Sequence, residues 1–524
     1  MAEWNIKCHS NEINDGIEST HQYSPLILDL IDTAEVHRMR NIVQLGFVPF
    51  VFPNAMHTRF IHSIGTARKM DNACDAIKAN NSGLINIDNY RAVLNTTALL
   101  HDIGQGALSH GLDVLIVPLV GGISHEQISA DLISGKYSLQ EHWSNLPDYV
   151  ASKSEKECQL EVLKKIPTLN EVLERYGVSS EIPSQIIDSK RTQREGRENA
   201  IGKLKFLIEL MDGKVLDVDK LEYLERDPKM TGVDEVGFNS DRIITNLNVV
   251  YHGGNYHLAI ERGALPDLTD LVATRKRMYS RVYTHRAVLK HEAMFYEACK
   301  RFLRVLFPEE GQENEKLARM IYMLDDRQFE SFLVRNSEDP ITISLFKTAK
   351  YDRRNRYEIA YGVESRNLPS VFSEENIEDL VLFQKLKNIT GRFPEDKIRH
   401  EILMRANSGN GSPKIQEHEV IVYSRPSKAG LTEEKFLDKF DLFVYDKRKT
   451  NGNPRMSSSK SSGKGVYYAP DALRDPNFYD DNLQRLFDTF TGHEVSYYFA
   501  VLSTKQHCER VSKATKEYVR ELLR

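Results

Sequence analysis

The sequence predicts a mainly α protein, with a helical core followed by a C-terminal mixed α+β region. Two observations support this fold class. From about residue 25 to residue 307, apolar residues recur at the three- and four-residue spacing of helices. Beyond residue 308, acidic and Gly/Ser-rich loops alternate with short β-branched and aromatic runs, which are typical of strands. We therefore expect a core of residues 1–307 and an oligomerisation or regulatory region of residues 308–524.

The composition is that of an ordinary globular protein. Hydrophobic residues make up 40% of the 524 positions and charged residues 28%, which excludes wholesale disorder. The 70 basic and 75 acidic side chains leave a net charge of −5, so no global basic field attracts nucleic acid. The five cysteines are odd in number and widely spaced, which argues for a reducing compartment rather than a disulfide framework.

No targeting or membrane-spanning segment is evident. The first residues lack the basic and apolar regions of a secretory signal, and no run of 18 apolar residues occurs. We expect a cytoplasmic protein that makes no membrane contact.

Two long helices are expected in the core. The first covers residues 59–79, where apolar side chains recur three or four positions apart and so share one helical face. The second covers residues 90–106 and runs into Gly104 and Gly106, which we expect to end it. Helices joined by short turns are expected up to residue 307.

The C-terminal region should contain both strands and helices. Residues 418–424 (HEVIVYS) and 440–446 (FDLFVYD) have the alternation and the side chains of strands. Residues 483–524 return to helical periodicity.

Three segments of the core carry side chains that bind divalent metals: His62, the adjacent His101 and Asp102, and Asp219. Imidazole nitrogens and carboxylate oxygens suit first-row cations, and an incomplete protein ligand set leaves positions for water and phosphate oxygens. Burying the His101–Asp102 pair at the end of an apolar helix requires a compensating partner. For this pair taken alone, a hydrogen-bonded core histidine beside a capping aspartate is the more common explanation. The whole set favours phosphoester or phosphoanhydride hydrolysis.

The motifs around these residues are more specific than the residues alone. They read RMRNIVQLGFVPFVFPNAMHTRFIHSIG before and around His62, HDIGQGALSHGLD from His101, SHEQIS from residue 124, and DVDKLEYLERD around Asp219. Together they resemble the motifs of the HD-domain phosphohydrolases, and in particular the deoxynucleoside triphosphate (dNTP) triphosphohydrolase branch. The resemblance implies an HD-domain helical core that hydrolyses dNTPs to deoxynucleoside and inorganic triphosphate.

The resemblance also implies a metal site. His62, His101, Asp102 and Asp219 would hold one divalent ion, for which Mg²⁺, Mn²⁺, iron and Zn²⁺ are all compatible. The ion would lie against the α-phosphate and activate water.

Proton transfer would belong to a second group of residues. By resemblance, His110 and His125 are catalytic, with Asp113 and Glu126 as their orienting partners. Imidazole titrates near neutral pH and can protonate the departing 5′-oxygen.

The resemblance implies several substrate contacts. Arg59, Lys220 and Arg275 would bind the triphosphate, because its oxygens need several cationic donors. Gln44 and Asp227 would bond the 3′-hydroxyl.

Two tyrosines would complete the substrate site. Tyr223 would pack against the deoxyribose, and on a helix it lies one turn from both Asp219 and Asp227. A later helix should carry Arg275 and Tyr283 on one face. Packing in the core would explain either tyrosine equally well.

Position 105 departs from the family. Many relatives have a histidine there, whereas this chain has Gln105. An amide does not titrate, so any proton-shuttling role of that position is lost here.

Two other functions are compatible with the sequence. An HD phosphodiesterase or nucleotidase acting on another nucleotide would use His110 and His125 to bind a second metal. A nucleic-acid-binding sensor with a vestigial HD core would use the basic clusters at 190–197, 352–356 and 457–464. The expected partners are thus a dNTP, further copies of the chain in a dimer-based homo-oligomer and, weakly, single-stranded nucleic acid.

Overall fold

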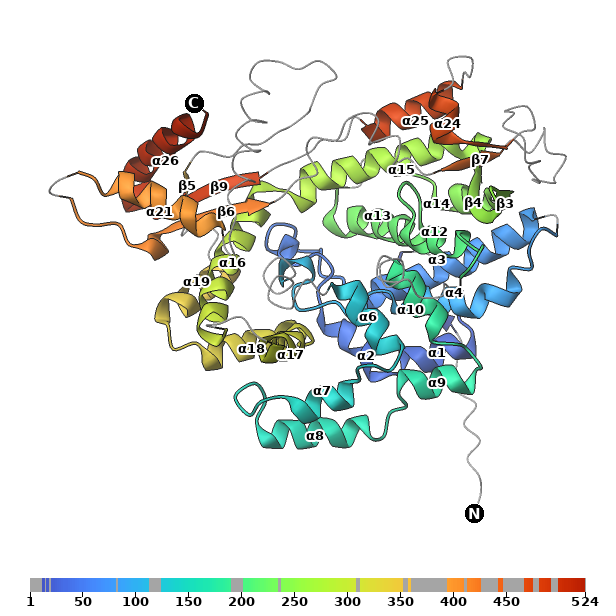
Figure 1. Ribbon diagram of the computed structural model, residues 1–524, viewed down its shortest axis with the longest axis horizontal. Helices are drawn as coiled ribbons and strands as arrows, with labels where there is room; N and C mark the ends of the chain where they lie inside the picture. Colours follow the sequence, from blue (N-terminus) through green and yellow to red (C-terminus); the bar gives the residue numbers. More distant parts are fainter. Residues whose placement is uncertain are drawn as a thin grey trace.

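The structure is a computed structural model that describes residues 12–14, 16–17, 20–81, 83–112, 124–189, 201–233, 237–307, 312–351, 357–359, 394–409, 412–425, 442–445, 466–474, 480–491 and 498–523. These residues form a mainly α fold with a few short strands, as the sequence predicts (Figure 1). Among the helices of these ranges, none is long and apolar enough to cross a lipid bilayer.

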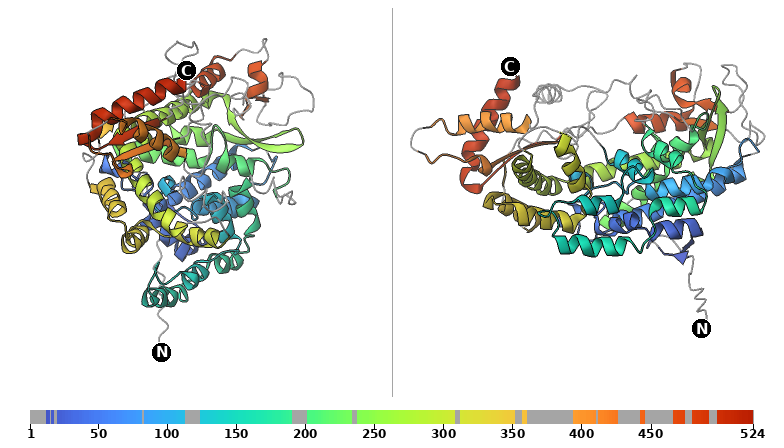
Figure 2. Two further views of the ribbon diagram at one scale, coloured as in Figure 1. Left: turned by 60° about the vertical axis from the view of Figure 1, so that its left-hand side comes forward. Right: turned by 60° about the horizontal axis from the view of Figure 1, so that its bottom comes forward.

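The first part of the chain forms a compact group of helices, seen from two further sides in Figure 2. Its helices are α1 (Pro25–Ile31), α2 (Ala34–Arg38), α3 (Arg59–Asn80), α4 (Asp88–Leu100), α6 (His125–Ile133), α7 (Leu139–Asn145), α8 (Lys153–Leu163), α9 (Leu169–Arg175), α10 (Glu181–Ile187), α12 (Phe206–Asp212), α13 (Val218–Thr231), α14 (Ser240–Thr245), α15 (Leu265–Met278) and α16 (Arg286–Leu306). A two-residue pairing of β1 (Glu12–Ile13) with β2 (His21–Gln22) precedes them.

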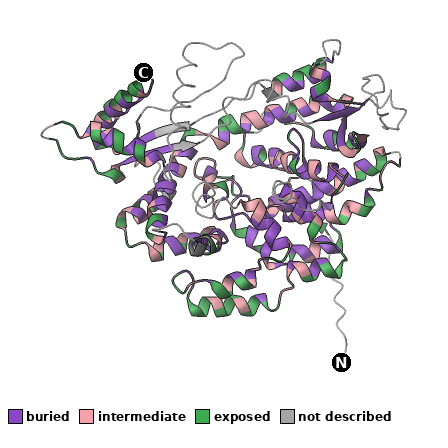
Figure 3. Cartoon of the chain, in the orientation of Figure 1, coloured by how far each residue is buried: buried purple, intermediate pink, exposed green. Residues whose placement is uncertain are grey.

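Helix α3 is the centre of this group. It packs against α4, α13, α14 and the strand that follows α14, and its residues from Arg59 to Met70 are buried on nearly every side (Figure 3). The sequence predicted one apolar face, but polar residues on the other face are buried as well. They are buried because α13 supplies partners: Nζ of Lys69, for example, lies 2.7 Å from Oε2 of Glu225.

Helix α4 ends earlier than the glycines of its motif predicted. Its last residue is Leu100, and the chain continues in tight turns in which the amide of Gln105 donates to the carbonyl of Asp102. The buried guanidinium of Arg38 stabilises these turns, because it donates to the carbonyl oxygens of Ile103 and Gln105, both at 2.7 Å.

The core also contains a hairpin that the sequence analysis did not predict. Strands β3 (Leu247–His252) and β4 (Asn255–Glu261) pair antiparallel. Gly253 and Gly254 connect them, both with positive φ (56° and 84°), a conformation that glycine adopts without strain. The core is therefore not purely helical.

Three helices follow residue 307 and pack back on the core. They are α17 (Gln312–Tyr322), α18 (Asp326–Asn336) and α19 (Pro340–Tyr351). Phe329 and Phe332 of α18 belong to the same hydrophobic cluster as α16, and α19 lies along α16. The main hydrophobic core thus continues past residue 307, and the division of the chain at that position stays a prediction.

The remaining elements lie in two places (Figure 1). In one, β5 (Tyr357–Ile359), β9 (Tyr498–Ser503) and β6 (Val420–Arg425) form an antiparallel sheet, in that order, with α21 (Pro394–Ala406) and α26 (Cys508–Leu523). In the other, β7 (Phe443–Tyr445) and β8 (Val466–Tyr468) extend the β3–β4 hairpin, beside α24 (Ala469–Arg474) and α25 (Asp481–Thr491).

The structure confirms two predicted strands and corrects one prediction. Strands β6 and β7 lie in the segments 418–424 and 440–446. The helical periodicity expected for 483–524 is interrupted by β9, whose buried central residues Val501 and Leu502 lie in a sheet between two neighbouring strands. A short apolar run of this kind has the same appearance in a buried helix and in a central strand.

Candidate metal and substrate site

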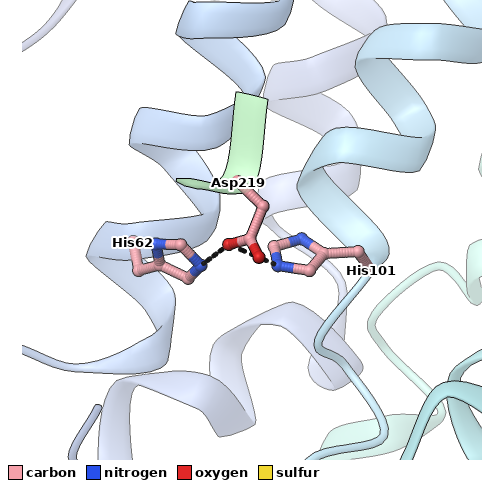
Figure 4. Close-up of side chains that lie close together, drawn as sticks. All are labelled: His62, His101 and Asp219. Atoms are coloured by element: carbon pink, nitrogen blue, oxygen red, sulfur yellow. Dashed lines mark ion pairs between the residues drawn. The ribbon is translucent and has the colours of Figure 1, made fainter. Parts of the chain in front are cut away.

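Three helices bring the four metal-capable residues together. His62 lies in the first turns of α3, His101 caps the C-terminus of α4, and Asp219 lies in the first turn of α13. Oδ1 of Asp219 is 3.1 Å from Nε2 of His62 and 3.7 Å from Nε2 of His101 (Figure 4). Oδ2 of Asp102 is 3.3 Å and 3.7 Å from Nε2 of His101 and His62. Residues distant in sequence thus face a single point.

The tautomer of each histidine suits a metal ligand. Nδ1 of His101 donates to the carbonyl of Ala98 at 2.9 Å, and Nδ1 of His62 contacts the Glu222 carboxylate. Each Nε2 is therefore turned toward Asp219, and neither has a hydrogen-bond partner within the described part of the chain. Holding Nδ1 in this way orients the ring and leaves Nε2 for a metal. The cluster of His62, His101 and Asp219 is able to hold a metal ion.

The carboxylates around these imidazoles create a strongly negative electrostatic potential at this point. Burial alone would lower the pKa of His62, but Glu222 and Asp219 outweigh it and raise this pKa to about 9. Burial also opposes charge on Asp102, yet Arg59 and His101 hold the pKa of its carboxyl well below the usual range. The cluster therefore favours a positive charge among its members, whether protons or a cation.

The start and end of α13 explain why Asp219 lies where it does. Asp217 is the N-cap, and its Oδ1 accepts a hydrogen bond from the amide of Lys220 at 2.7 Å. Gly232, in the left-handed conformation with φ of 72°, ends the helix. Between these caps, the spacing of three residues turns Asp219 and Glu222 toward the same histidine of α3, His62.

A cavity of about 950 Å³ adjoins the cluster and gathers most of the residues that the family resemblance singled out. His101, Asp102 and Asp219 lie on its wall. Its lining also includes Gln44, Arg59, His110, His125, Glu126, Lys220, Tyr223, Asp227, Arg275 and Tyr283. Asp113 lies outside the described residues, as do the basic clusters at 190–197, 352–356 and 457–464. The roles expected of all these residues stay predictions.

The two histidines expected to move protons are neighbours. The ring centroids of His110 and His125 are 5.5 Å apart. His125 is the first residue of α6, and its Nδ1 is 3.7 Å from Oε2 of Glu126. His110 is exposed on the cavity side, so both rings have access to a molecule bound there.

Two of the three expected phosphate-binding cations already have carboxylate partners. Arg59 contacts Asp102 and donates from Nε to Oγ of Ser109 at 3.0 Å. Lys220 contacts Asp217 and donates to the carbonyl of Gly213 at 2.8 Å. Nε of Arg275 is buried and has no hydrogen-bond partner within the described residues, so Arg275 offers a donor that these contacts do not occupy.

The structure corrects the helix expected to carry Arg275 and Tyr283. Helix α15 ends at Met278, and Tyr279–Tyr283 forms a π-helical turn in which the amide of Thr284 bonds the carbonyl of Tyr279. The wider π-helical turn changes the directions in which the side chains of this segment point. Tyr283 is half-buried, with its hydroxyl donating to Asp227, whereas Tyr279 is exposed.

Two residues of the site were missed by the sequence analysis. His57 bonds Asp227 through Nε2, and Glu222 orients His62. Both lie inside the quoted motifs, His57 two positions before Arg59 and Glu222 three after Asp219. The spacing of three on α13 was the available signal for Glu222, whereas nothing in the sequence pairs His57 with a residue of α13.

Gln105 lies behind the site rather than in it. The side chain is fully buried, its Nε2 is 3.5 Å from the hydroxyl of Tyr322, and it is absent from the cavity wall. The structure thus places position 105 in the packing beneath the His101–Asp102 turn.

Comparison with known proteins agrees with the motifs. No family model matches the chain. The deoxynucleoside triphosphate triphosphohydrolase SAMHD1 of Gallus gallus is 27% identical over 379 residues, which are 70% of this chain and 56% of that protein. An uncharacterized protein of Methanocaldococcus jannaschii is 27% identical over 414 residues (79% of this chain, 72% of that protein). The SAMHD1 homologue of Dictyostelium discoideum is 25% identical over 466 residues (86% and 76%).

These matches are distant, and the chain spans about half the length of the chicken protein. The mainly α fold and the His/Asp cluster agree with this similarity. The chain is accordingly similar, at a distance, to the HD-domain deoxynucleoside triphosphate triphosphohydrolases.

Proposed function

We propose that this protein is a metal-dependent hydrolase that converts dNTPs to deoxynucleoside and inorganic triphosphate. One observation carries the proposal: Nε2 of His62 and of His101, which have no hydrogen-bond partner among the described residues, converge with Asp219 beside a cavity of nucleotide size. Relatives named as dNTP triphosphohydrolases support an HD-superfamily hydrolase in general. The particular substrate is the proposal.

His62, His101, Asp102 and Asp219 would hold the metal. When bound, a divalent ion polarises the α-phosphate and lowers the pKa of water. The protein prepares the site by fixing both rings: the Ala98 carbonyl holds His101, and the Glu222 carboxylate holds His62. Arg59 balances the charge of Asp102 and keeps that carboxylate directed at the cluster.

The cavity wall would bind the nucleotide. Oε1 of Gln44 is buried without a hydrogen-bond partner among the described residues, so it is ready to accept a bond from the 3′-hydroxyl. Asp227, on the same wall, is the second expected contact to that hydroxyl, and Tyr223 lies between Asp227 and Asp219 along α13. Arg275 offers a buried donor to a phosphate oxygen.

The expected reaction needs one proton at the leaving group. Water adds to the α-phosphorus, the bond from this phosphorus to the 5′-oxygen breaks, and the 5′-oxygen takes a proton. His110 and His125 would deliver it, because their rings are adjacent at the cavity and imidazole exchanges protons near pH 7.

The test is direct. The purified full-length protein is incubated with each dNTP and Mg²⁺ or Mn²⁺, and tripolyphosphate is sought by ion chromatography. We expect tripolyphosphate, its loss on chelation, and its loss in the variant in which His101 and Asp102 are both alanine. If that double variant folds and keeps full activity, the site assignment is wrong. If the wild-type protein releases monophosphate or diphosphate instead, the reaction is wrong.

An HD phosphodiesterase is the second candidate, in which the neighbouring His110 and His125, with ring centroids 5.5 Å apart, would bind another metal. Among the described residues, only the His62 cluster groups three ligands closely. Metal analysis separates the two: one ion per chain supports dNTP hydrolysis, and two ions support the phosphodiesterase. The homo-oligomer and the cytoplasmic location stay predictions. Sedimentation velocity would measure the oligomeric state.

A further inference from the structure

Helix α18, beyond the segments that carry the family motifs, reaches the site through one carboxylate. Oδ2 of Asp326 accepts a hydrogen bond from the amide of Val43 at 3.0 Å, and Oδ1 accepts one from the amide of Leu108 at 2.6 Å. Asp326 is the first residue of α18, and Asp325 is the N-cap that starts the helix. One side chain therefore joins two segments that are far apart in sequence.

Both segments continue directly into the cavity wall. Gln44, Leu45 and Gly46 line the cavity immediately after Val43. Ser109, His110 and Gly111 line it immediately after Leu108. A shift at either bonded amide is thus passed to a cavity residue one or two positions away.

The backbone at Leu108 has an unfavourable conformation that depends on contacts from outside its own segment. Leu108 and Ser109 have φ values of 55° and 53°, in the left-handed region that residues other than glycine rarely adopt. Such conformations are unfavourable and persist where surrounding contacts impose them. The bond from the Leu108 amide to Asp326 is one of these contacts.

The second segment is linked to the first by further bonds. Oγ of Ser109 donates to the carbonyl of Val43 at 2.7 Å and accepts from Nε of Arg59 at 3.0 Å. A Cβ at Gly46 would lie 2.9 Å from the carbonyl oxygen of Leu108, so the two backbones touch there. Asp326 therefore bonds two segments, 43–46 and 108–111, that are also in contact with each other; we call them the paired unit.

Three of the four metal-capable residues are held independently of this unit, and the fourth, Asp102, is linked to it through Arg59 and Ser109. His62 and Asp219 are carried by α3 and α13, and His101 is held by Ala98. Neither of the two hydrogen bonds of Asp326 reaches these residues. Loss of Asp326 should consequently affect the substrate wall more than the affinity for the ion.

We propose that Asp326 is a positioning residue, which holds the segments 43–46 and 108–111 together and so sets Gln44, Arg59 and His110 in place for the substrate. This inference rests on the proposed function for its effect on turnover. The hydrogen bonds themselves are tested without any substrate.

The experiment compares full-length Asp326→Asn and Asp326→Ala with Asp325→Asn. The asparagine variant at 326 keeps one acceptor and opposes the other amide with a donor, whereas the alanine variant removes both acceptors. Asp325→Asn removes an equal charge one residue away, and asparagine remains a good N-cap. It leaves both bonds of Asp326 intact, so it is the matched control.

The first readout is amide hydrogen exchange measured by mass spectrometry on peptides that cover Val43 and Leu108. We expect faster exchange in both peptides for the two Asp326 variants, with peptides from α3 and α13 unchanged and the control like the wild type. Unchanged exchange at both sites in Asp326→Ala would overturn the proposal, whatever the activity.

The second readout separates metal binding from turnover. Mn²⁺ affinity measured by calorimetry should stay within about twofold of the wild type, while kcat for the best dNTP falls about tenfold in Asp326→Asn and further in Asp326→Ala, consistent with the loss of one and two hydrogen bonds to a charged acceptor. Equal losses of kcat in Asp325→Asn, or loss of Mn²⁺ binding, would also overturn the proposal.

If the wild-type protein hydrolyses no dNTP, the proposed function fails, and the exchange data alone decide on Asp326. If Asp326→Ala does not fold, Asp326→Asn decides.

Discussion

Nε2 of His57 lies 2.8 Å from Oδ1 of Asp227, although 170 residues separate them in the sequence. Both side chains are 2% exposed. The hydroxyl of Tyr283 donates to the other oxygen of the same carboxylate. Asp227 is therefore oriented from two sides, as its proposed contact with the 3′-hydroxyl of a substrate would require.

His57→Gln should weaken binding of substrates that carry a 3′-hydroxyl. Without the imidazole, Asp227 loses one of its two orienting bonds, and we expect kcat/KM for a dNTP to fall about tenfold, the worth of roughly one such bond. The 2′,3′-dideoxy analogue has no group for Asp227 to bond, so its kcat/KM should change by less than about threefold. Equal losses for both substrates would show that His57 serves the fold and not the recognition of this hydroxyl.

Glu222→Gln should weaken metal binding. The carboxylate holds Nδ1 of His62 and also pairs with Nε of Arg226. A partner of this kind changes metal affinity by about 10- to 100-fold when it is removed. The measurement is the dissociation constant of Mn²⁺ by calorimetry at constant pH.

The matched control for this prediction is Glu225→Gln on the same helix. Glu225 pairs with the buried Lys69 and accepts a hydrogen bond from Ser240, and neither partner belongs to the metal cluster. This variant should lose thermal stability and keep its Mn²⁺ affinity. The role given to Glu222 is wrong if both variants bind Mn²⁺ alike.

Acid should destabilise the protein in part through His142 of α7. Burial, and then the charge of Arg38, lowers the pKa of His142 to about 3. Because the unfolded chain binds this proton near pH 6.5, the stabilising contribution is complete above pH 6.5 and is lost as the pH falls toward 3. At pH 5 the loss is on the order of 2 kcal/mol.

Thermal unfolding of wild type and His142→Gln at pH 7.5 and pH 5 measures this contribution. The glutamine variant should be the less stable protein at pH 7.5, and its Tm should fall less on acidification. His37→Gln, at an exposed position of α2, is the control and should follow the wild type. Parallel pH curves for wild type and His142→Gln would contradict the assignment.

A buried charge cluster joins the core to the β5–β9–β6 sheet region. Oε1 of Glu297, on α16, is 2.6 Å from Nη1 of Arg399 on α21, and Oε2 is 2.6 Å from Nζ of Lys300. The three side chains are at most 4% exposed. Glu297→Gln leaves two buried cations with one fewer carboxylate, which should lower the unfolding free energy by about 3 kcal/mol or more.

Glu401→Gln is the control for this prediction, because Glu401 pairs with Arg405 at the exposed surface of α21. That variant should change stability by less than about 1 kcal/mol. Urea unfolding followed by circular dichroism compares the two. A stability change in Glu297→Gln as small as that of the surface variant would show that the buried cluster contributes little.

Much of the site could be read from the sequence because its residues lie in local patterns. The spacing of Asp219, Tyr223 and Asp227 predicts one stripe of a helix, and α13 spans all three. The His101–Asp102 pair at the end of an apolar helix is where the structure places it, at the C-cap of α4. Here the turn geometry of a helix connects the sequence directly to the direction of the side chains.

Other features depend on distant partners. The π-helical turn at Tyr279–Tyr283 and the β9 strand depart from the α-helical structure that the periodicity of their segments predicts. Tyr283 in the first segment donates to the carboxylate of Asp227, and β9 pairs with two neighbouring strands. Local propensity is weak compared with such tertiary contacts.

By itself, the sequence determined the mainly α fold, the family resemblance and the four metal-capable side chains, because these follow from helical spacing and from short motifs. Only the tertiary structure decided which groups surround them: His57 beside Asp227, Glu222 behind His62, and Asp326 between two segments of the cavity wall. A hydrogen bond requires two groups within about 3 Å. Between residues far apart in the chain, that proximity is set by packing and leaves no periodic trace in the sequence.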